Sequence, residues 1–429
     1  MNYKECLRYL EKIQNLGIKF GLDNVRTILS SLDNPHRKYP SLLVAGTNGK
    51  GSVCAMLSHI LTLHHLRVGL FTSPHLIKVE ERIRIGERPI SSQDFCRELT
   101  LLRETIEDLI TSKKLSSSPT YFELLTCLAF NLFKKKKVNV AILEVGMGGR
   151  FDATNVVIPI VSIITTISKE HQKFLGDTLV EIASEKAGII KPGIPVVCGV
   201  TKREAFKTIK EKASELEAPF YGVFDKKDCF NPKKTQSGYS FIYESNSEKY
   251  LYSPSLPGKH QGENAAVVIV ASERLSKNWK RLEKENIIKG IEGTRWEGRL
   301  EILPSNPRVI LDGAHNEEGA RALKSYIQEF ITAPLILVAA FMRDKKIETI
   351  ANILFPLAER IILTRFPYYR AATPEEICDK ALEFKDKIIL EPNTKKALEM
   401  ALFQANPQGC ILFTGSLYLV GEVKKYLPY

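Results

Sequence analysis

Seven consecutive residues of this 429-residue chain combine the chemical groups that bind phosphate. They are Gly46, Thr47, Asn48, Gly49, Lys50, Gly51 and Ser52. Glycines let a backbone approach a ligand closely, a lysine ammonium reaches β- and γ-phosphates, and a serine hydroxyl can bind Mg²⁺. The common phosphate-loop pattern places Ser or Thr directly after the lysine, whereas Gly51 intervenes here. The composition nevertheless favours a nucleotide-phosphate site over an ordinary strand–helix turn.

The residues on either side of this loop predict the elements that position it. Residues 42–45 are apolar and predict a buried strand, and residues 52–65 carry apolar side chains at helical spacing. The free N–H groups and the dipole at the start of a helix both favour an anion. The sequence therefore predicts an anion site where the strand, the loop and the helix meet.

A carboxylate stands at the end of a second predicted strand. Residues 138–144 form an apolar run that ends in Glu144, and the glycine-rich segment 146–149 follows. A carboxylate at such a position in a phosphate-loop domain is suited to contact Mg²⁺, directly or through water. The alternative, a glutamate on a surface loop, stays open from the residues alone.

Apolar strands alternate with helical patterns along the chain, which predicts an α/β fold. We expect residues 1–296 to form a phosphate-loop ATPase-like N-terminal domain, and residues 297–429 a smaller Rossmann-like α/β domain. The strands expected in the second domain are 308–312, 335–341, 360–364, 387–390 and 410–414.

Several further elements are expected in the first domain. Short amphipathic helices are predicted at 2–14 and 22–32, and a β-rich excursion at 219–253. Ser91 and the Thr120/Glu123 pair carry helix-capping patterns. A helix rich in Ala and Val is expected after residues 258–264.

The composition limits the classes of partner. The net charge of +12 arises within residues 1–300, because residues 301–429 contain 16 Lys or Arg and 16 Asp or Glu. A basic surface attracts nucleotides and polyanionic substrates as well as nucleic acid. No apolar run approaches 18 residues and the N-terminus lacks a signal-peptide core, so no membrane segment is expected. Eight scattered cysteines without a C-x-x-C pair predict free thiols in the cytoplasm.

Seven motifs in register resemble those of the folylpolyglutamate synthase/dihydrofolate synthase family of the Mur-ligase superfamily. Beside the phosphate loop they are Thr72–Leu76, Glu144–Arg150 with Asp152–Asn155, Glu185–Lys191, His260-Gln261 with Asn264-Ala265, Asp312–Asn316, and Gly415–Gly421. The one-residue departure from the common phosphate-loop pattern is a feature of that family.

The resemblance implies an ATP-dependent carboxylate–amine ligase that forms ADP. It would join L-glutamate to dihydropteroate or a reduced folate through an acyl phosphate, with ATP in a cleft between the domains. The implied cofactors are ATP and Mg²⁺, with a monovalent cation left open. The implied partners are small molecules (dihydropteroate or folate, L-glutamate and ATP), with no nucleic acid and no membrane, and the chain would act as a cytoplasmic monomer.

The resemblance also implies roles for individual residues. Nucleotide contacts beside the phosphate loop are implied for Asn264, Arg299 and Asp312. The implied metal ligands are Ser52, Ser73, Glu144 and His171. The implied catalytic residues are Lys50, Lys186 and His315. The implied substrate contacts are Ser73, Pro74, His75, Arg82, Thr120, Phe122, Glu123 and Asp152.

Two residues depart from the family pattern. Glu170 stands before His171 where the family usually has Asp, and Lys346 stands where an acidic residue is usual. We interpret both as tolerated changes, the first affecting the surroundings of the metal site and the second the cleft.

We further predict that Lys186 is carbamylated, because it lies in the family segment that contains such a lysine. A buried, unpaired ammonium beside Mg²⁺ would be costly, whereas a carbamate offers oxygens to a hard cation. The alternative is an ordinary lysine that is exposed or paired with Glu185 or Glu144.

Two other functions stay open. One is a related ligase acting on a peptidoglycan or cyanophycin precursor, against which the 72–76 loop and the compact second domain count. The other is a nucleotide-gated nucleic-acid-binding protein, motivated by the charge, although no interleaved basic–aromatic motif is present. The sequence also leaves open whether one or both family activities are present.

Overall fold

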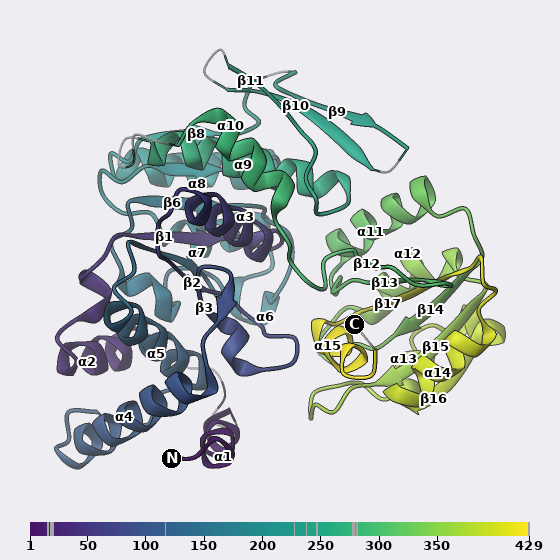
Figure 1. Ribbon diagram of the computed structural model, residues 1–429, viewed down its shortest axis with the longest axis horizontal. Helices are drawn as coiled ribbons and strands as arrows, with labels where there is room; N and C mark the ends of the chain where they lie inside the picture. The colour runs from purple at the N-terminus through teal and green to yellow at the C-terminus, as the bar shows by residue number, and fades with distance from the viewer. Residues whose placement is uncertain are drawn as a thin grey trace.

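The computed structural model describes residues 1–427 except 15–16, 18–20, 116, 227, 237, 246–247, 277–278 and 280–281. Two α/β units lie side by side in Figure 1, each built around its own sheet. We call residues 3–293 the first unit and residues 301–424 the second unit. The expected α/β fold with a second, smaller α/β part is confirmed.

The first unit contains an eight-stranded sheet in the order β4-β3-β2-β5-β1-β6-β7-β8. The strands are β1 Ser41–Ala45, β2 Val68–Phe71, β3 Ile83–Ile85, β4 Arg88–Pro89, β5 Val140–Glu144, β6 Val161–Ile164, β7 Val196–Cys198 and β8 Phe220–Gly222. The six strands from β2 to β8 in this order pair in parallel, and β3 and β4 continue the sheet antiparallel. Because helices cover both faces, the central strands β1, β5 and β6 are buried at every residue.

The helices of the first unit form one hydrophobic core on each face of the sheet. One face packs against α1 Tyr3–Gln14, α2 Asp23–Ser31, α4 Ser92–Thr111, α5 Tyr121–Lys135, α7 Leu179–Ala187 and α8 Arg203–Glu215. The other packs against α3 Lys50–Leu63, α9 Lys259–Leu275 and α10 Lys284–Gly293. The short helix α6 Gln172–Leu175 follows β6.

A separate three-stranded antiparallel sheet accounts for most of the predicted β-rich excursion. It consists of β9 Phe230–Lys234, β10 Tyr239–Ser245 and β11 Glu248–Tyr252. Its inward side chains, among them Phe241 and Tyr252, join the core beneath α9. In Figure 1 this sheet projects above the first unit, on the side of α11 of the second unit.

The second unit contains a six-stranded sheet in the order β12-β13-β17-β14-β15-β16, of which only β12 runs antiparallel among the described strands. The strands are β12 Glu301–Leu303, β13 Arg308–Leu311, β14 Leu335–Ala339, β15 Arg360–Arg365, β16 Ile388–Asn393 and β17 Cys410–Thr414. The helices are α11 Glu317–Phe330, α12 Ile347–Leu354, α13 Pro374–Cys378, α14 Thr394–Gln404 and α15 Leu417–Lys424.

The predicted elements agree with the structure except at some boundaries. The capping patterns are confirmed, because Ser91 accepts from the amide of Asp94 and Thr120 and Glu123 cap α5 reciprocally. Two helix starts were wrong: α3 begins at Lys50 rather than Ser52, and α9 begins at Lys259 rather than after Asn264. Most of the expected linker between α1 and α2 lies outside the described residues.

No helix among the described residues is long and apolar enough to cross a membrane. All eight cysteines are free thiols, as the sequence predicted.

A candidate nucleotide and ligation site between the two units

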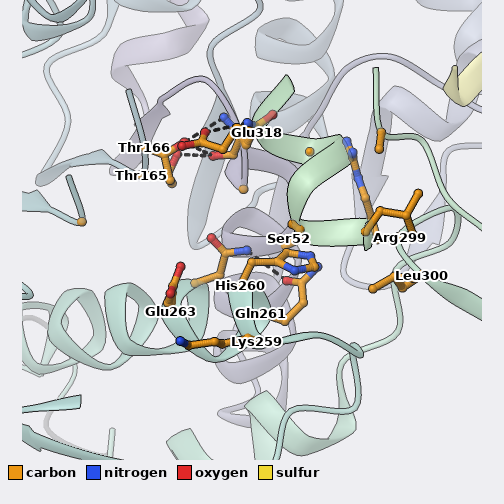
Figure 2. A pocket seen from close by; sticks show the side chains of 18 of the residues that line it. Ser52, Thr165, Thr166, Lys259, His260, Gln261, Glu263, Arg299, Leu300 and Glu318 are labelled. Carbon is orange, nitrogen blue, oxygen red and sulfur yellow. Dashed lines mark hydrogen bonds between the residues drawn. The ribbon is translucent and has the colours of Figure 1, made fainter. Parts of the chain in front are cut away.

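The carboxyl ends of strands from both sheets face a shared cavity of about 290 Å³. The first unit contributes the phosphate loop after β1, the segment after β6 and the first turn of α9. The second unit contributes the segment after β13 and the start of α11. The predicted site residues that line the cavity are Asn48, Gly49, Gly51, Ser52, Asn264, Arg299, Asp312 and His315. Figure 2 shows Ser52, His260 and Gln261 beside Arg299 and Leu300 in this cavity.

Two glycines of the phosphate loop stand where no other residue fits. A Cβ at Gly46 would lie 1.9 Å from the Thr165 hydroxyl oxygen, and one at Gly49 would lie 2.3 Å from the Asn264 amide oxygen. Both also adopt positive φ, 149° and 84°. The loop therefore packs its backbone against the neighbouring segments, and Gly49 directly precedes the first turn of α3. Gly49, Gly51 and Ser52 line the cavity, so the start of α3 with its free amide groups borders it, as an anion site requires.

Two lysines converge on the carbonyl oxygen of Gly46. Lys50 donates to it at 3.0 Å and to the Thr47 carbonyl at 3.1 Å, and Lys186 donates to it at 2.8 Å. Burial and the charge of Lys50 lower the pKa of Lys186 to about 7. Lys186 is 4% exposed, which excludes the alternative of an exposed lysine. Its hydrogen bond is to Gly46, while Glu185 lies 3.6 Å from Arg150.

Asn48 links the phosphate loop to the second unit. Its side chain exchanges two hydrogen bonds with Asn316, at 2.9 and 3.3 Å, and donates to Glu318 at 2.8 Å. Its backbone carbonyl accepts from Thr165 at 2.6 Å. Asn316 is also the N-cap of α11, so the start of that helix is fixed relative to the phosphate loop.

The three predicted nucleotide contacts outside the phosphate loop all lie at the cavity. Asn264 is buried and bonded to Gln261, Asp312 accepts from the amides of Leu300 and Ala314, and Arg299 lines the cavity. Burial raises the pKa of Asp312, and the two amide bonds and Arg299 oppose that shift. The structure thus brings residues from both units to one cavity wall, and their contacts with ATP stay a prediction.

A smaller cavity of about 40 Å³ adjoins the phosphate loop at Gly51. Ser73, Pro74, Glu144 and Arg299 also line it. The Glu144 carboxylate is 3% exposed and accepts from the Ser73 amide at 3.0 Å, and burial raises its pKa. Ser73 and Glu144 line this cavity, Ser52 lines the larger one, and Gly51 lines both. A carboxylate and serine hydroxyls are oxygen donors that suit Mg²⁺, so the three residue types fit the predicted metal.

The fourth predicted ligand, His171, has different neighbours. It lines neither cavity, and its ring nitrogen lies 3.9 Å from Glu170. Burial lowers its pKa to about 4, so the ring is neutral at pH 7, the form that binds a metal. The described residues contain no cluster of three His, Cys, Asp or Glu able to hold a metal. The four-residue ligand set stays a prediction.

Glu170 lies between side chains of the second unit. It accepts from His315 at 3.0 Å and from Lys345 at 2.8 Å. Burial alone would raise the pKa of Glu170, but the bond from His315 and the nearby positive charges hold it well below its usual value.

In the segment predicted to contact the folate substrate, two polar side chains pair with each other. Arg82 donates to His75 at 2.9 Å and lies 5.2 Å over the ring of Tyr121. Burial and the adjacent Arg82 lower the pKa of His75 to about 3. His75 also contacts Tyr418 of the second unit edge-on, at 6.5 Å between ring centroids.

The other predicted substrate residues stabilise local structure. Thr120 and Glu123 bond to each other as the cap of α5, and Phe122 packs against Gly146 and Phe71. Asp152 is buried and accepts from the amides of Gly146 and Met147 and from Thr154, which shapes the loop after β5. Their contacts with substrate stay predictions.

Several cavity residues had no signal in the sequence analysis. Thr165 and Thr166 follow β6, Glu318 lies in the first turn of α11, and Phe224, Tyr239 and Tyr326 line the apolar end. For Glu318 alone the sequence contains a signal that could have placed it, because it follows Asn316, a residue type that caps helices. Lys345, which contacts Glu170, lies in the segment where only Lys346 had been singled out.

Family models match both units in turn. Residues 44–272 match the Mur ligase middle domain, and residues 300–426 match the C-terminal domain of dihydrofolate synthetase. With a phosphate loop at a cavity that a second α/β unit completes, these matches define the class: an ATP-dependent, ADP-forming ligase of the Mur type.

Relatives that match along the full length identify the family within this class. The chain is 35% identical over 429 residues to the dihydrofolate synthase/folylpolyglutamate synthase of Bacillus subtilis, covering 99% of each chain. It is 33% identical to the folylpolyglutamate synthase of Lacticaseibacillus casei, covering 100% of this chain and 99% of that one. The chain belongs to the dihydrofolate synthase/folylpolyglutamate synthase family.

Solved structures of proteins with this family's names share the fold of this chain. The folylpolyglutamate synthase of Mycobacterium tuberculosis complexed with ADP and AMPPCP superposes with a TM-score of 0.90 at 28% identity, covering 100% of this chain and 99% of that one. Escherichia coli FolC in complex with DHPP and ADP gives a TM-score of 0.86 at 27% identity, covering 98% and 97%.

Proposed function

We propose that this chain attaches L-glutamate to dihydropteroate, to a reduced folate, or to both, with ATP converted to ADP and phosphate. The observation that carries the proposal is the single cavity lined by the phosphate loop and by the Asp312–His315 segment of the second unit. Relatives that match the full length are named for these two activities, which supports the same substrate class here.

In the first step a carboxylate oxygen of the pteroate or folate attacks the γ-phosphorus of ATP. A new P–O bond forms, the bond to the β-phosphate oxygen breaks, and ADP leaves. Amides at the start of α3 and the ammonium of Lys50 would hold the transferred group, because charge spreads over its oxygens in the transition state. Lys50 would exchange its bonds to the loop carbonyls for bonds to phosphate. Mg²⁺ bound by Ser52, Ser73 and Glu144 would neutralise phosphate charge.

In the second step the neutral amine of L-glutamate attacks the acyl carbon. The C–N bond forms, a proton leaves the nitrogen, and the tetrahedral intermediate expels phosphate. His315 comes from the second unit and lines the cavity beside the loop, so it would lie near these reacting groups. The cavity excludes bulk water once the units close, which protects the acyl phosphate from hydrolysis.

We also propose a domain boundary, an oligomeric state and a cellular location for the enzyme. The boundary between a domain of residues 1–296 and one of residues 297–429 is supported by the separate sheets. A monomer is supported because both walls of the cavity come from one chain, and a cytoplasmic location by the free thiols. Lys134, Lys135 and Lys136 each pair with an acidic residue, which supports a ligand other than nucleic acid for the basic surface.

Mass analysis of products tests this function. The chain is incubated with ATP, Mg²⁺ and L-glutamate, in one reaction with dihydropteroate and in another with tetrahydrofolate. We expect a product heavier by one glutamate residue in at least one reaction, with stoichiometric ADP. No glutamylated product in either reaction would overturn the proposal, and which reaction works decides between one activity and two.

A further inference from the structure

Glu170 joins two loops of the second unit from a position in the first unit. It lies in the segment between β6 and α6, while His315 follows β13 and Lys345 follows β14. One carboxylate oxygen, Oε1, accepts from both partners, at 3.0 and 2.8 Å. The side chains of Glu170 and Lys345 are 11% and 14% exposed, so this contact is largely shielded from solvent.

The two ring nitrogens of His315 face acceptors from different units. Nε2 faces Glu170, and Nδ1 lies 2.8 Å from the carbonyl oxygen of Gly313. Both groups accept, so the imidazolium form of His315 donates to both of them, and a ring held in this way cannot rotate without breaking one of these bonds. Its orientation in the cavity is therefore set by the position of Glu170.

The charge around this contact explains why a carboxylate is needed. Lys50 and Lys186 converge on the phosphate loop, and the charges of both, as well as that of Lys345, act on neighbouring His171. Lys345 therefore lies within electrostatic reach of the same histidine as these cations, and like charges repel. Glu170 supplies the negative charge that lets Lys345 enter a shielded site, since a buried cation needs a partner.

We propose that Glu170 is a positioning residue for ligation: it draws Lys345 and His315 across the cleft and orients them towards the reacting groups. The proposal rests on the proposed function, because it assumes that His315 acts on the acyl phosphate. It goes beyond the interpretation of Glu170 as a tolerated change near the metal site. Glu170 itself touches no reacting atom in this role.

The test compares four single variants and one double variant with the wild-type enzyme, by steady-state kinetics with ATP and L-glutamate varied separately. Glu170→Gln keeps the size but removes the charge, and Glu170→Asp keeps the charge. Lys345→Met removes the partner cation. Glu329→Gln is the matched control, because Glu329 also makes a bond between the units, to Tyr239, but lies outside the cavity lining.

We expect Glu170→Gln to lower kcat about 10²-fold, the loss typical of a misplaced catalytic group, with the KM for ATP changed less than threefold. Glu170→Asp should keep at least a tenth of the wild-type kcat. Glu329→Gln should keep kcat within threefold of wild type, because we expect its bond to Tyr239 to affect only the KM for ATP. Adding Lys345→Met to Glu170→Gln should lower kcat less than threefold further, since both substitutions break the same contact.

Three results would overturn the proposal: a Glu170→Gln kcat within threefold of wild type, equal losses in Glu170→Gln and Glu329→Gln, or multiplicative losses in the double variant. Hydrogen exchange supplies a readout that needs no turnover. Peptides covering 311–318 and 340–347 should exchange faster in Glu170→Gln than in wild type or Glu329→Gln, and unchanged exchange would refute the contact. An inactive wild-type enzyme would overturn the proposed function while hydrogen exchange still decides the role of Glu170.

Discussion

The two units meet at one cavity, but they contribute to it in different ways. The first unit presents a phosphate site built on backbone, a loop in which Gly46 and Gly49 leave no room for a Cβ, followed by the start of α3, with side chains such as that of Asn264 beside it. The second unit presents the side chains of Asp312 and His315 to the cavity from the loop after β13, and Lys345 on the loop after β14 contacts Glu170. A phosphate site can therefore exist in the first unit alone, whereas the groups expected at the reacting carbon arrive only when the second unit docks. Nucleotide binding and ligation should be separable on this basis.

Removing the second unit should have the largest effect. A fragment of residues 1–296 keeps the phosphate loop and both cores of the first unit but loses Asp312 and His315. We expect no detectable glutamylated product from the fragment, measured by mass spectrometry beside the full chain, with circular dichroism to show that it is folded. Ligation at the rate of the full chain would refute a shared site.

Replacing Lys50 should affect the phosphate site of the first unit. Lys50→Ala removes the ammonium expected on the transferred phosphate, so kcat should fall about 10²- to 10³-fold, the scale of one lost electrostatic contact. Phosphate release in steady state measures this. A folded variant with near-normal kcat would show that the lysine only braces the loop carbonyls that it contacts here.

The state of Lys186 can be tested through pH and carbon dioxide. Carbamylation needs the neutral amine, whose nitrogen attacks CO₂ and releases a proton. Because the pKa of Lys186 is lowered to about 7, the neutral fraction rises from roughly a tenth at pH 6 to roughly nine tenths at pH 8. After removal of CO₂, added bicarbonate should restore activity faster at pH 8 than at pH 6.

Substitution gives a second readout for Lys186. Lys186→Ala should lose activity about 10²-fold and partly regain it with short carboxylates, whereas Lys191→Ala, a lysine of the same motif, should not respond to them. No dependence on bicarbonate, or a bare amine in a nucleotide-bound crystal grown with bicarbonate, would contradict carbamylation.

The smallest effect is expected at the apolar end of the cavity. Tyr239 lines the cavity and its hydroxyl donates to Glu329 of the second unit. Tyr239→Phe keeps the ring and removes this bond, worth about 1 kcal/mol, so the KM for ATP should rise roughly fivefold with kcat unchanged. A fall in kcat with an unchanged KM would place Tyr239 in the chemistry instead.

Most of the fold could be predicted from local patterns in the sequence. The buried strand β14 is apolar throughout, and β1 and β5 are apolar except for Ser41 at the start of β1 and Glu144 at the end of β5. Helix caps such as Thr120 with Glu123 lie within four consecutive residues, so a local pattern predicts them. Short edge strands such as β12 were missed because a three-residue strand with partly exposed side chains has no distinctive period. The start of α9 was misplaced because its first turn carries cavity residues rather than apolar ones.

The candidate site was predictable where residues act within a motif and not where they meet across the cleft. The phosphate loop could be recognised from its own seven residues. The contact between Glu170 and Lys345 joins positions 175 residues apart, and no periodicity encodes such a pair. The sequence showed Glu170 only as an unusual neighbour of His171, whereas the structure shows which side chains it holds.

A crystal structure of the chain with AMPPCP and Mg²⁺ tests the shared site most directly. The account predicts that the analogue occupies the cavity of about 290 Å³, with its phosphates at residues 49–52 and contacts from the Asp312–His315 segment. An analogue held by the first unit alone, with the second unit turned away and Asp312 and His315 out of contact, would contradict it.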